Sequence, residues 1–106
     1  MRALRFHALV IRSFWGPGTE DVFNGVDSRR ARRVCPSTIW VVARRKLDQL
    51  DATVSLDALR VPPGNQLEAL RKDRRGQHSI RINGQFRICF VWTADGPESV
   101  AIVDYH

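Results

Sequence analysis

The chain has 106 residues, which is enough for one compact domain and too few for two. Apolar residues make up 43% of it, so it can build a hydrophobic core and is not a disordered chain. Lys and Arg number 17 against 11 Asp and Glu, which gives a net charge of +6, and nearly all of these cations are Arg. This balance favours a polyanionic partner, although a basic surface can also serve solubility alone.

The cysteine and histidine content argues against a disulfide framework or a metal site. Cys35 and Cys89 lie far apart and form no paired motif, so we expect two reduced, partly buried thiols. Three scattered histidines predict neither a metal nor another cofactor. No apolar run approaches the roughly 20 residues that cross a bilayer, and residues 2–10 are too short for a signal peptide. The sequence therefore predicts a soluble, cytoplasmic protein.

The first third of the chain predicts a strand and a short helix. Residues 10–14 are typical of a β-strand, and the breakers in residues 15–18 would end it. Thr19 is the expected N-cap of a helix that the Asn-Gly pair at 24–25 would stop. Residues 29–33 contain four arginines, which indicate either a solvated loop or helix edge, or a contact with RNA or an acidic partner.

The clearest helix is predicted over residues 36–51. Pro36 suits the first turn of a helix, and the residues that follow recur at helical spacing to cover one face of a sheet, namely Ile39, Val42, Ala43, Leu47 and Leu50. We interpret Trp40 as a residue of the core or its edge and not as a base-stacking platform. Ser55 is expected to cap a single turn over residues 56–59, which the two prolines in residues 61–64 prevent from continuing.

A β-hairpin is predicted over residues 79–90, with its register set by the apolar side chains. A two-residue turn would pair Ile82 with Gln85 and mix polar and apolar residues on both faces. A three-residue loop instead pairs Ile82 with Phe86 and Ile80 with Ile88. We therefore predict the three-residue loop, with an apolar face that packs against the helix.

The other face of this hairpin would be cationic. The same register places Arg81 opposite Arg87, an arrangement that makes most sense with a phosphate between the two side chains. Residues 67–70 are expected to form a short extended segment that presents Glu68 and Arg71. Residues 93–97 are predicted as a turn, and residues 98–104 as the final strand.

The chain ends on a carboxylate, a phenol and an imidazole, Asp104, Tyr105 and His106. Cleavage of RNA without a metal needs a base that takes the 2′-OH proton, an acid for the leaving 5′-oxygen, and cations that stabilise the phosphate. Histidine is the usual acid or base near neutral pH, and the carboxylate could orient it. Six cations lie nearby in the sequence, namely Arg71, Lys72, Arg74, Arg75, Arg81 and Arg87. The alternative is a polar chain end beside a solvated charged face.

Three stretches resemble the HigB-type toxins of bacterial toxin–antitoxin modules, within the RelE/ParE superfamily. They are residues 61–70, 76–90 and 103–106, and the resemblance as a whole covers residues 10–106. It implies one toxin domain over residues 1–106, with residues 1–9 as an N-terminal extension. The implied fold is α+β and RelE-like, with N-terminal helices packed on one face of a small, mainly antiparallel β-sheet and a basic cleft on the other.

The resemblance also implies an activity and partners. It implies a metal-independent endoribonuclease that cuts mRNA on the ribosome through the RNA 2′-OH and so inhibits translation. The implied partners are the ribosome, mRNA and a cognate HigA-type helix-turn-helix antitoxin, through which the complex would bind its operator DNA. The implied catalytic residues are His106, Asp104, Tyr105, Arg87, Arg71 and Glu68, and the implied RNA- or ribosome-binding residues are Arg81, Lys72, Arg74 and Arg75.

The chain departs from the family pattern at four positions, three of which are among these site residues. Arg71 stands where the family has Lys, and it keeps the charge but cannot donate a proton in catalysis. Lys72 replaces a Gly, Glu68 stands where some members have His, and Phe86 replaces a Trp at a core position. Two other functions remain open at this point, a ParE-like poison of DNA gyrase and a non-catalytic RNA- or ribosome-binding module. The terminal histidine is the feature that favours the nuclease.

Overall fold

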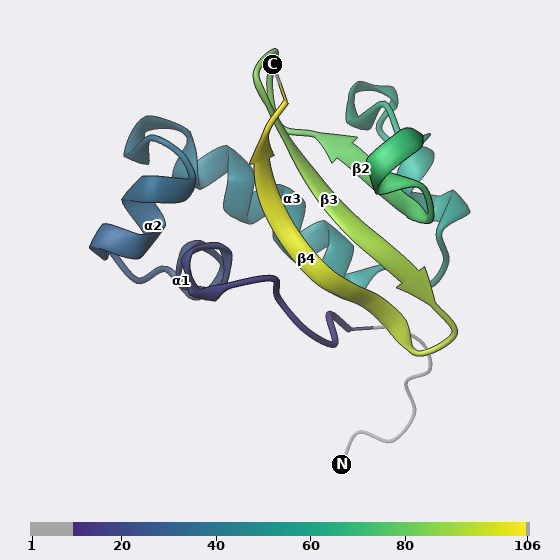
Figure 1. The fold of residues 1–106 in the computed structure, drawn as a ribbon, viewed down its shortest axis with the longest axis horizontal. Coiled ribbons are helices and arrows are strands. Elements are labelled where there is room, and N and C mark those ends of the chain that lie inside the picture. Colours follow the sequence, from purple (N-terminus) through teal and green to yellow (C-terminus); the bar gives the residue numbers. More distant parts are fainter. Residues whose placement is uncertain (1–9, 106) are drawn as a thin grey trace.

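The computed structural model describes residues 10–105 and shows a four-stranded antiparallel sheet in the order β1-β2-β3-β4, with helices against one face (Figure 1). The helices are α1 (Pro17–Asn24), α2 (Arg29–Val34) and α3 (Trp40–Ala52), and the strands are β1 (Glu68–Ala69), β2 (Gln77–Arg81), β3 (Phe86–Thr93) and β4 (Gly96–Asp104). Short 3-10 turns connect them, namely η1 (Ser37–Ile39), η2 (Asp57–Arg60), η3 (Pro63–Asn65) and η4 (Lys72–Arg74). The predicted α+β, RelE-like architecture is confirmed. The proposed extension, residues 1–9, lies outside the described residues.

The core forms where α3 packs against the sheet. Leu47 and Leu50 of α3 are fully buried and belong to one hydrophobic cluster with Ile80 and Ile88 of the hairpin. Burial of these side chains provides the main favourable free energy for joining helix and sheet. The helix begins at residue 40 rather than 36, because residues 37–39 form the tighter turn η1. Trp40 lies at the edge of the core, where its Nε1 donates to a backbone carbonyl at 3.1 Å.

The register of the central hairpin is as predicted. Ile80 pairs with Ile88, and the N–H of Ile82 donates to the carbonyl of Phe86 at 2.9 Å across a three-residue loop. The Asn83 side chain closes this loop, because its Oδ1 accepts from the N–H groups of residues 85 and 86, each at 2.8 Å. This side-chain cap explains why the loop needs no glycine at residue 85. The last strand begins at residue 96 rather than 98, so the predicted turn shortens to residues 94–95.

The prediction of a strand over residues 10–14 is wrong. This segment makes only one parallel bridge, between Phe14 and Val100, and a few backbone hydrogen bonds to β4. The chain cannot continue along β4 because Pro17 starts helix α1 three residues later, and its ring fixes a helical φ angle. The segment therefore lies beside β4 without becoming a fifth strand.

Thr19 does not cap α1, contrary to the prediction. Gly16 occupies the N-cap position, and no side chain caps the helix there. Thr19 lies inside the first turn and is 2% exposed, and its Oγ1 accepts a hydrogen bond from the N–H of Ile102 at 3.0 Å. Gly18 beside it allows the close approach of α1 to α2, since a Cβ there would lie 2.6 Å from the carbonyl oxygen of Arg30. The start of α1 is thus held by β4 and α2. The end of α1 is as predicted, with Gly25 in the left-handed conformation.

We expect Thr19→Val to lower the free energy of unfolding by about 1 to 3 kcal/mol, because it keeps the shape of the side chain but leaves the buried N–H of Ile102 without an acceptor. Denaturant titration of both proteins measures the difference. Thr38→Val is the matched control at an exposed position, where the change should stay within about 0.5 kcal/mol. Equal stability of Thr19→Val and the parent would contradict the role assigned to this hydroxyl.

The arginine-rich segment, residues 29–33, forms helix α2 and not a loop. Ser28 caps this helix, because its Oγ accepts from the N–H of Ala31 at 3.0 Å. The hydrogen bond from the Ser28 hydroxyl and the ion pair with Arg30 lower the pKa of Asp21 below its usual value. Arg32 pairs with an aspartate as well, whereas Arg29 and Arg33 form no ion pair with any described residue. Part of the basic charge of α2 therefore remains available to a partner.

The two thiols are more deeply buried than we expected. Cys35 is 2% exposed and Cys89 is 1% exposed, and both are free. Burial raises the pKa of Cys35 to about 11 and also raises the pKa of Cys89. Both thiols therefore stay protonated near neutral pH and act as small apolar side chains. Within the described chain, no helix is long and apolar enough to cross a bilayer.

Candidate active site

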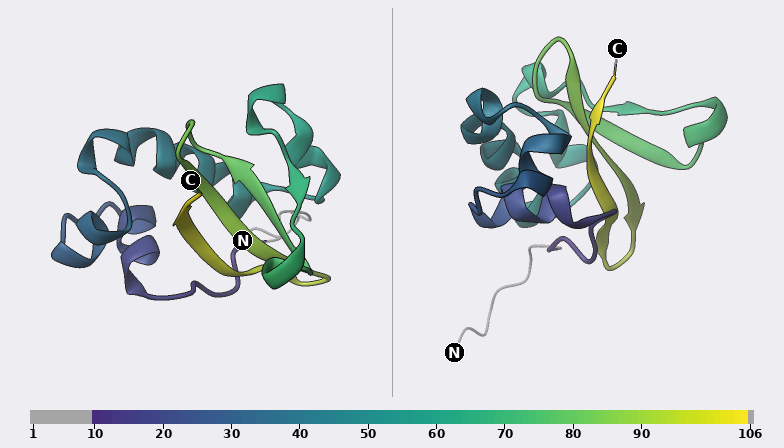
Figure 2. Two further views of the ribbon diagram at one scale, coloured as in Figure 1. Left: turned by 45° about the horizontal axis from the view of Figure 1, so that its top comes forward. Right: turned by 60° about the vertical axis from the view of Figure 1, so that its left-hand side comes forward.

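The candidate site lies on the face of the sheet that the helices leave open. Figure 2 (right) shows the chain between β1 and β2, which carries η4, projecting from the sheet on the side away from the helices. β1 pairs with β2, and the core residues Ile80 and Ile88 point to the helix side, so the alternation of side chains places Ser79 and Arg87 on the open face.

Arg87 is a buried cation that the protein holds in one position. It is 8% exposed, and its Nε donates to the hydroxyl of Ser79 at 2.7 Å. Its Nη2 donates to the carbonyl of Gln66 and, at 3.4 Å, to that of Ser79. The positive charge is thus fixed by β2 and by the loop before β1. The predicted opposition of Arg81 and Arg87 is confirmed, and the guanidinium of Arg87 turns toward Ser79 and Gln66.

The phenol ring of Tyr105 lies against this guanidinium. Its backbone N–H donates to the carbonyl of Gln85 at 2.7 Å, which fixes the chain just after β4. The Cζ of Arg87 lies 5.9 Å from the centroid of the phenol ring, within the range of a cation–π contact. The tyrosine is 38% exposed, so a ligand can still reach the ring.

Asp104 already has a partner in the hairpin loop. Its Oδ2 accepts a hydrogen bond from the side-chain amide of Gln85 at 3.1 Å, and the side chain is exposed. This contact ties the end of β4 to the loop between β2 and β3. His106, the residue that Asp104 was expected to orient, lies outside the described residues.

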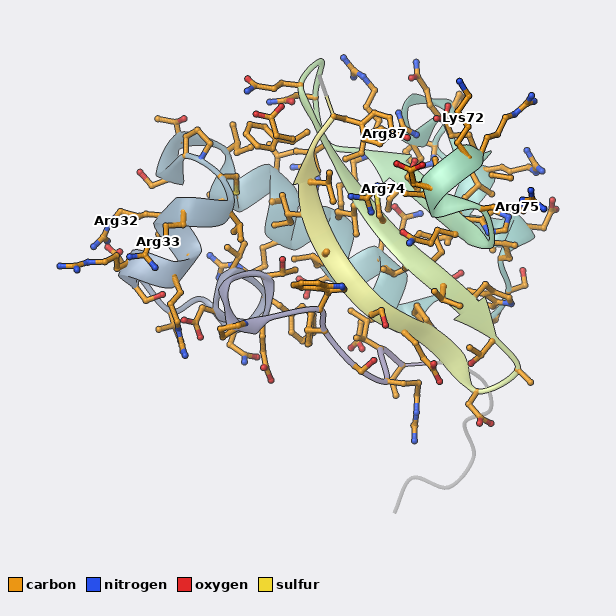
Figure 3. The ribbon with its side chains drawn as sticks, in the orientation of Figure 1. Arg32, Arg33, Lys72, Arg74, Arg75 and Arg87 are labelled. Carbon is orange, nitrogen blue, oxygen red and sulfur yellow. The ribbon has the colours of Figure 1, made fainter. Side chains whose placement is uncertain are left out.

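A cationic pocket of about 360 Å³ joins the basic segment to the end of β4. It is lined by Arg71, Lys72, Asp73, Arg74, Val103, Asp104 and Tyr105. A second hollow of about 370 Å³ adjoins it, since Arg71, Lys72 and Tyr105 line both, and this hollow adds Glu68. Figure 3 shows Lys72, Arg74 and Arg87 gathered in the same part of the molecule. We call the two hollows together the basic pocket.

Comparison with known proteins identifies the family of this chain. The family model described as "RelE-like toxin of type II toxin-antitoxin system HigB" matches residues 20–106. Toxin HigB-1 of Vibrio cholerae serotype O1 is 41% identical over 80 residues, which cover 76% of this chain and 82% of the relative. The chain belongs to the HigB family of RelE-like toxins. An uncharacterized protein of Haemophilus influenzae is 40% identical over 55 residues, 52% of this chain and 54% of that protein.

Family membership establishes the general role of this HigB-family chain. It is the toxin of a type II toxin–antitoxin system, which implies a cognate antitoxin as its partner. Toxins of this RelE-like family are in general endoribonucleases. The basic pocket is therefore the place to look for RNA chemistry.

The structure brings most of the predicted site residues together. Those that line the basic pocket are Glu68, Arg71, Lys72, Arg74, Asp104 and Tyr105, and Arg87 lies beneath Tyr105. Arg75 and Arg81 line neither hollow. The residues missed from the sequence are Gln66, Asp73, Ser79 and Gln85. The hairpin register alone would have placed Ser79 on the face of Arg87, whereas the approach of Gln66 depends on tertiary packing.

Lys72 is the one departure from the HigB pattern that carries a visible backbone cost. Its φ angle is +54°, a left-handed conformation that favours glycine, the residue that the resemblance places there in other members. A side chain in this conformation costs roughly 1 kcal/mol. The chain tolerates that strain and gains a cation at the rim of the basic pocket.

Proposed function

We propose that this HigB-family toxin cleaves mRNA on the ribosome, without a metal, through attack of the RNA 2′-OH on the adjacent phosphate. The observation that carries the proposal is the Arg87 guanidinium, held by Ser79 and Gln66 beneath Tyr105 and beside the basic pocket. A cation fixed before the substrate arrives stabilises developing negative charge on a phosphate without having to reorganise.

In the proposed reaction the 2′-oxygen forms a bond to phosphorus as a base removes its proton. The bond from phosphorus to the 5′-oxygen breaks, and an acid protonates that oxygen as it leaves. The products are a 2′,3′-cyclic phosphate and a free 5′-hydroxyl. Arg87, Arg71 and Arg74 would stabilise the phosphate. Because arginine stays protonated at working pH, none of the three serves as acid or base.

The acid and the base would then come from the remaining titratable groups of the site. His106 is the leading candidate, because imidazole exchanges protons near neutral pH. Glu68 is exposed, lines the basic pocket and forms no ion pair with the described residues, so its carboxylate can act as the base. Asp104 would orient the substrate or His106 from the end of β4, and Tyr105 would stack on a base.

The proposed partners follow the same chemistry. Arg75 and Arg81 lie outside the basic pocket and would contact ribosomal RNA, because arginine forms forked hydrogen bonds with phosphate. The cognate antitoxin would be a HigA-type helix-turn-helix protein, which would also attach the toxin–antitoxin complex to its operator DNA. The net charge of +6 supports association with a polyanion.

Purified protein added to a translating extract should cut mRNA, and the chemistry of the new ends tests the mechanism. We expect a 2′,3′-cyclic or 3′-phosphate upstream of the cut and a 5′-hydroxyl downstream. A 2′-O-methyl group on the nucleotide before the cut should block cleavage there, while unmodified mRNA is cut in the same reaction. Ends with a 3′-hydroxyl and a 5′-phosphate would contradict the proposed chemistry. Inhibition of gyrase supercoiling with intact mRNA would contradict the proposed function.

A further inference from the structure

A third hollow, of about 700 Å³, lies beside the end of β4 and is lined by residues of α1, α2 and the η4 segment. We call it the Trp15 groove, and it is lined by Trp15, the first turn of α1, Arg33, Val34, Arg74, Val103 and Asp104, among others. The nuclease chemistry described above uses neither Trp15 nor Arg33. The groove therefore needs an explanation of its own.

Trp15 exposes a large apolar ring on a firmly anchored backbone. The residue is 73% exposed, although leaving a large apolar ring in contact with water costs free energy. Its backbone N–H donates to the carbonyl of Val100 at 3.0 Å, next to the bridge between Phe14 and β4. An indole presented on a fixed backbone is a suitable platform for a flat ligand, and nucleobases of any sequence stack on such rings.

The charges around the groove favour an anion. Arg33 of α2 and Arg74 of the η4 segment reach it from opposite sides of β4 (Figure 3), and neither forms an ion pair with a described residue. A third arginine in the lining, Arg30, is already paired with Asp21. Asp104 is the only carboxylate among the residues that line the groove, and it accepts a hydrogen bond from Gln85.

The groove is also continuous with the basic pocket. Arg74, Val103 and Asp104 line both hollows, so a single strand can pass from one to the other along the end of β4. An aromatic ring and cations that line one continuous path form the usual surface for single-stranded nucleic acid. A polypeptide partner explains the charges, but it does not explain why the path leads into a pocket built for phosphate chemistry.

We infer that the Trp15 groove binds the nucleotides next to the cleavage site, with one base stacked on Trp15 and neighbouring phosphates on Arg33 and Arg74. This inference rests on the proposed function, because it takes the ligand of the basic pocket to be RNA. It makes Trp15 a substrate-binding residue that takes no part in the bond-breaking step.

The test measures binding of the full-length protein to a single-stranded RNA of about eight nucleotides, a typical length for such grooves, with every ribose 2′-O-methylated so that it stays intact. Trp15→Leu, which removes the ring but stays apolar, should weaken binding about tenfold, and Trp15→Phe should restore most of it. Arg33→Ala should lower the slope of log affinity against log salt by about 0.7, the value for one lost phosphate contact on a single strand.

Arg29→Ala is the matched control, because it removes an exposed arginine of the same helix that does not line the groove. The inference is overturned if Trp15→Leu binds RNA as the parent does, or if Arg29→Ala changes the salt slope as much as Arg33→Ala. If the parent cleaves mRNA but Trp15→Leu and Arg33→Ala bind RNA as the parent does, this inference is contradicted and the proposed function is not. If the parent leaves mRNA intact but Trp15→Leu binds RNA about tenfold more weakly than the parent, the result supports RNA binding in the groove and contradicts the proposed nuclease activity.

Discussion

Arg87→Lys is expected to slow mRNA cleavage by about 10²- to 10³-fold, the usual loss when one preorganised donor to a developing oxyanion is removed. Lysine keeps the charge, but a single ammonium cannot bind Ser79 and Gln66 through two separate nitrogens while it faces a phosphate. The measurement is the rate of mRNA cleavage in a translating extract at saturating toxin. Arg45→Lys is the matched control, because Arg45 is an exposed arginine of α3 that lines neither hollow of the basic pocket.

The same substitution also tests the structural part of the role of Arg87. The carbonyl of Gln66 would lose its donor, so stability should fall by about 1 to 3 kcal/mol. Cleavage must therefore be compared at a temperature where denaturant titration shows both proteins folded. A folded Arg87→Lys variant that cuts mRNA at the parent rate would show that this arginine only supports the fold.

His106→Ala is expected to lower the cleavage rate by about 10²- to 10⁴-fold, the range for losing a general acid or base. The pH profile of kcat/KM should lose one of its limbs, because the group that titrates in that limb would be gone. Binding of the 2′-O-methylated RNA should change by no more than about threefold, since the proposed loss lies in the chemical step.

Glu68→Gln is the companion variant, and it separates two assignments of acid and base. If His106 is the acid and Glu68 the base, each variant should remove a different limb of the pH profile. Full activity of His106→Ala would contradict the proposed role of the terminal imidazole and leave Glu68 and Asp104 as the titratable candidates. Tyr105→Phe should keep most of the activity, because the ring over Arg87 is retained.

Local sequence determined the helix over α3 and the hairpin of β2 and β3. In α3, apolar residues recur at intervals that place Ala43, Leu47 and Leu50 on one face of the helix. Packing this face against the sheet buries all three side chains. In the hairpin, a shift of one residue would turn Ile80 and Ile88 from the core to the solvent, so the alternating pattern allowed one register. The candidate residues Arg71, Arg87 and Tyr105 were visible too, because their spacing and type matched both the chemistry and a family pattern.

Tertiary structure alone decided how these residues meet. The loop that carries Gln66 bonds to Arg87 across 21 residues, and Ile102 bonds to Thr19 across 83, and neither contact leaves a periodic signal in the sequence. Thr19 satisfies the rules for a helix cap, but its hydroxyl oxygen instead accepts the hydrogen bond of a buried N–H of β4. Leaving that buried N–H without an acceptor would cost more free energy than leaving the start of α1 without a cap. Residues 10–14 have strand propensity, but they pair with β4 only at the bridge between Phe14 and Val100. Helix α1 starts at Pro17 and turns the chain away from β4. Sequence periodicity reports which face of an element is buried, whereas a site made of several elements depends on how those faces are brought together in space.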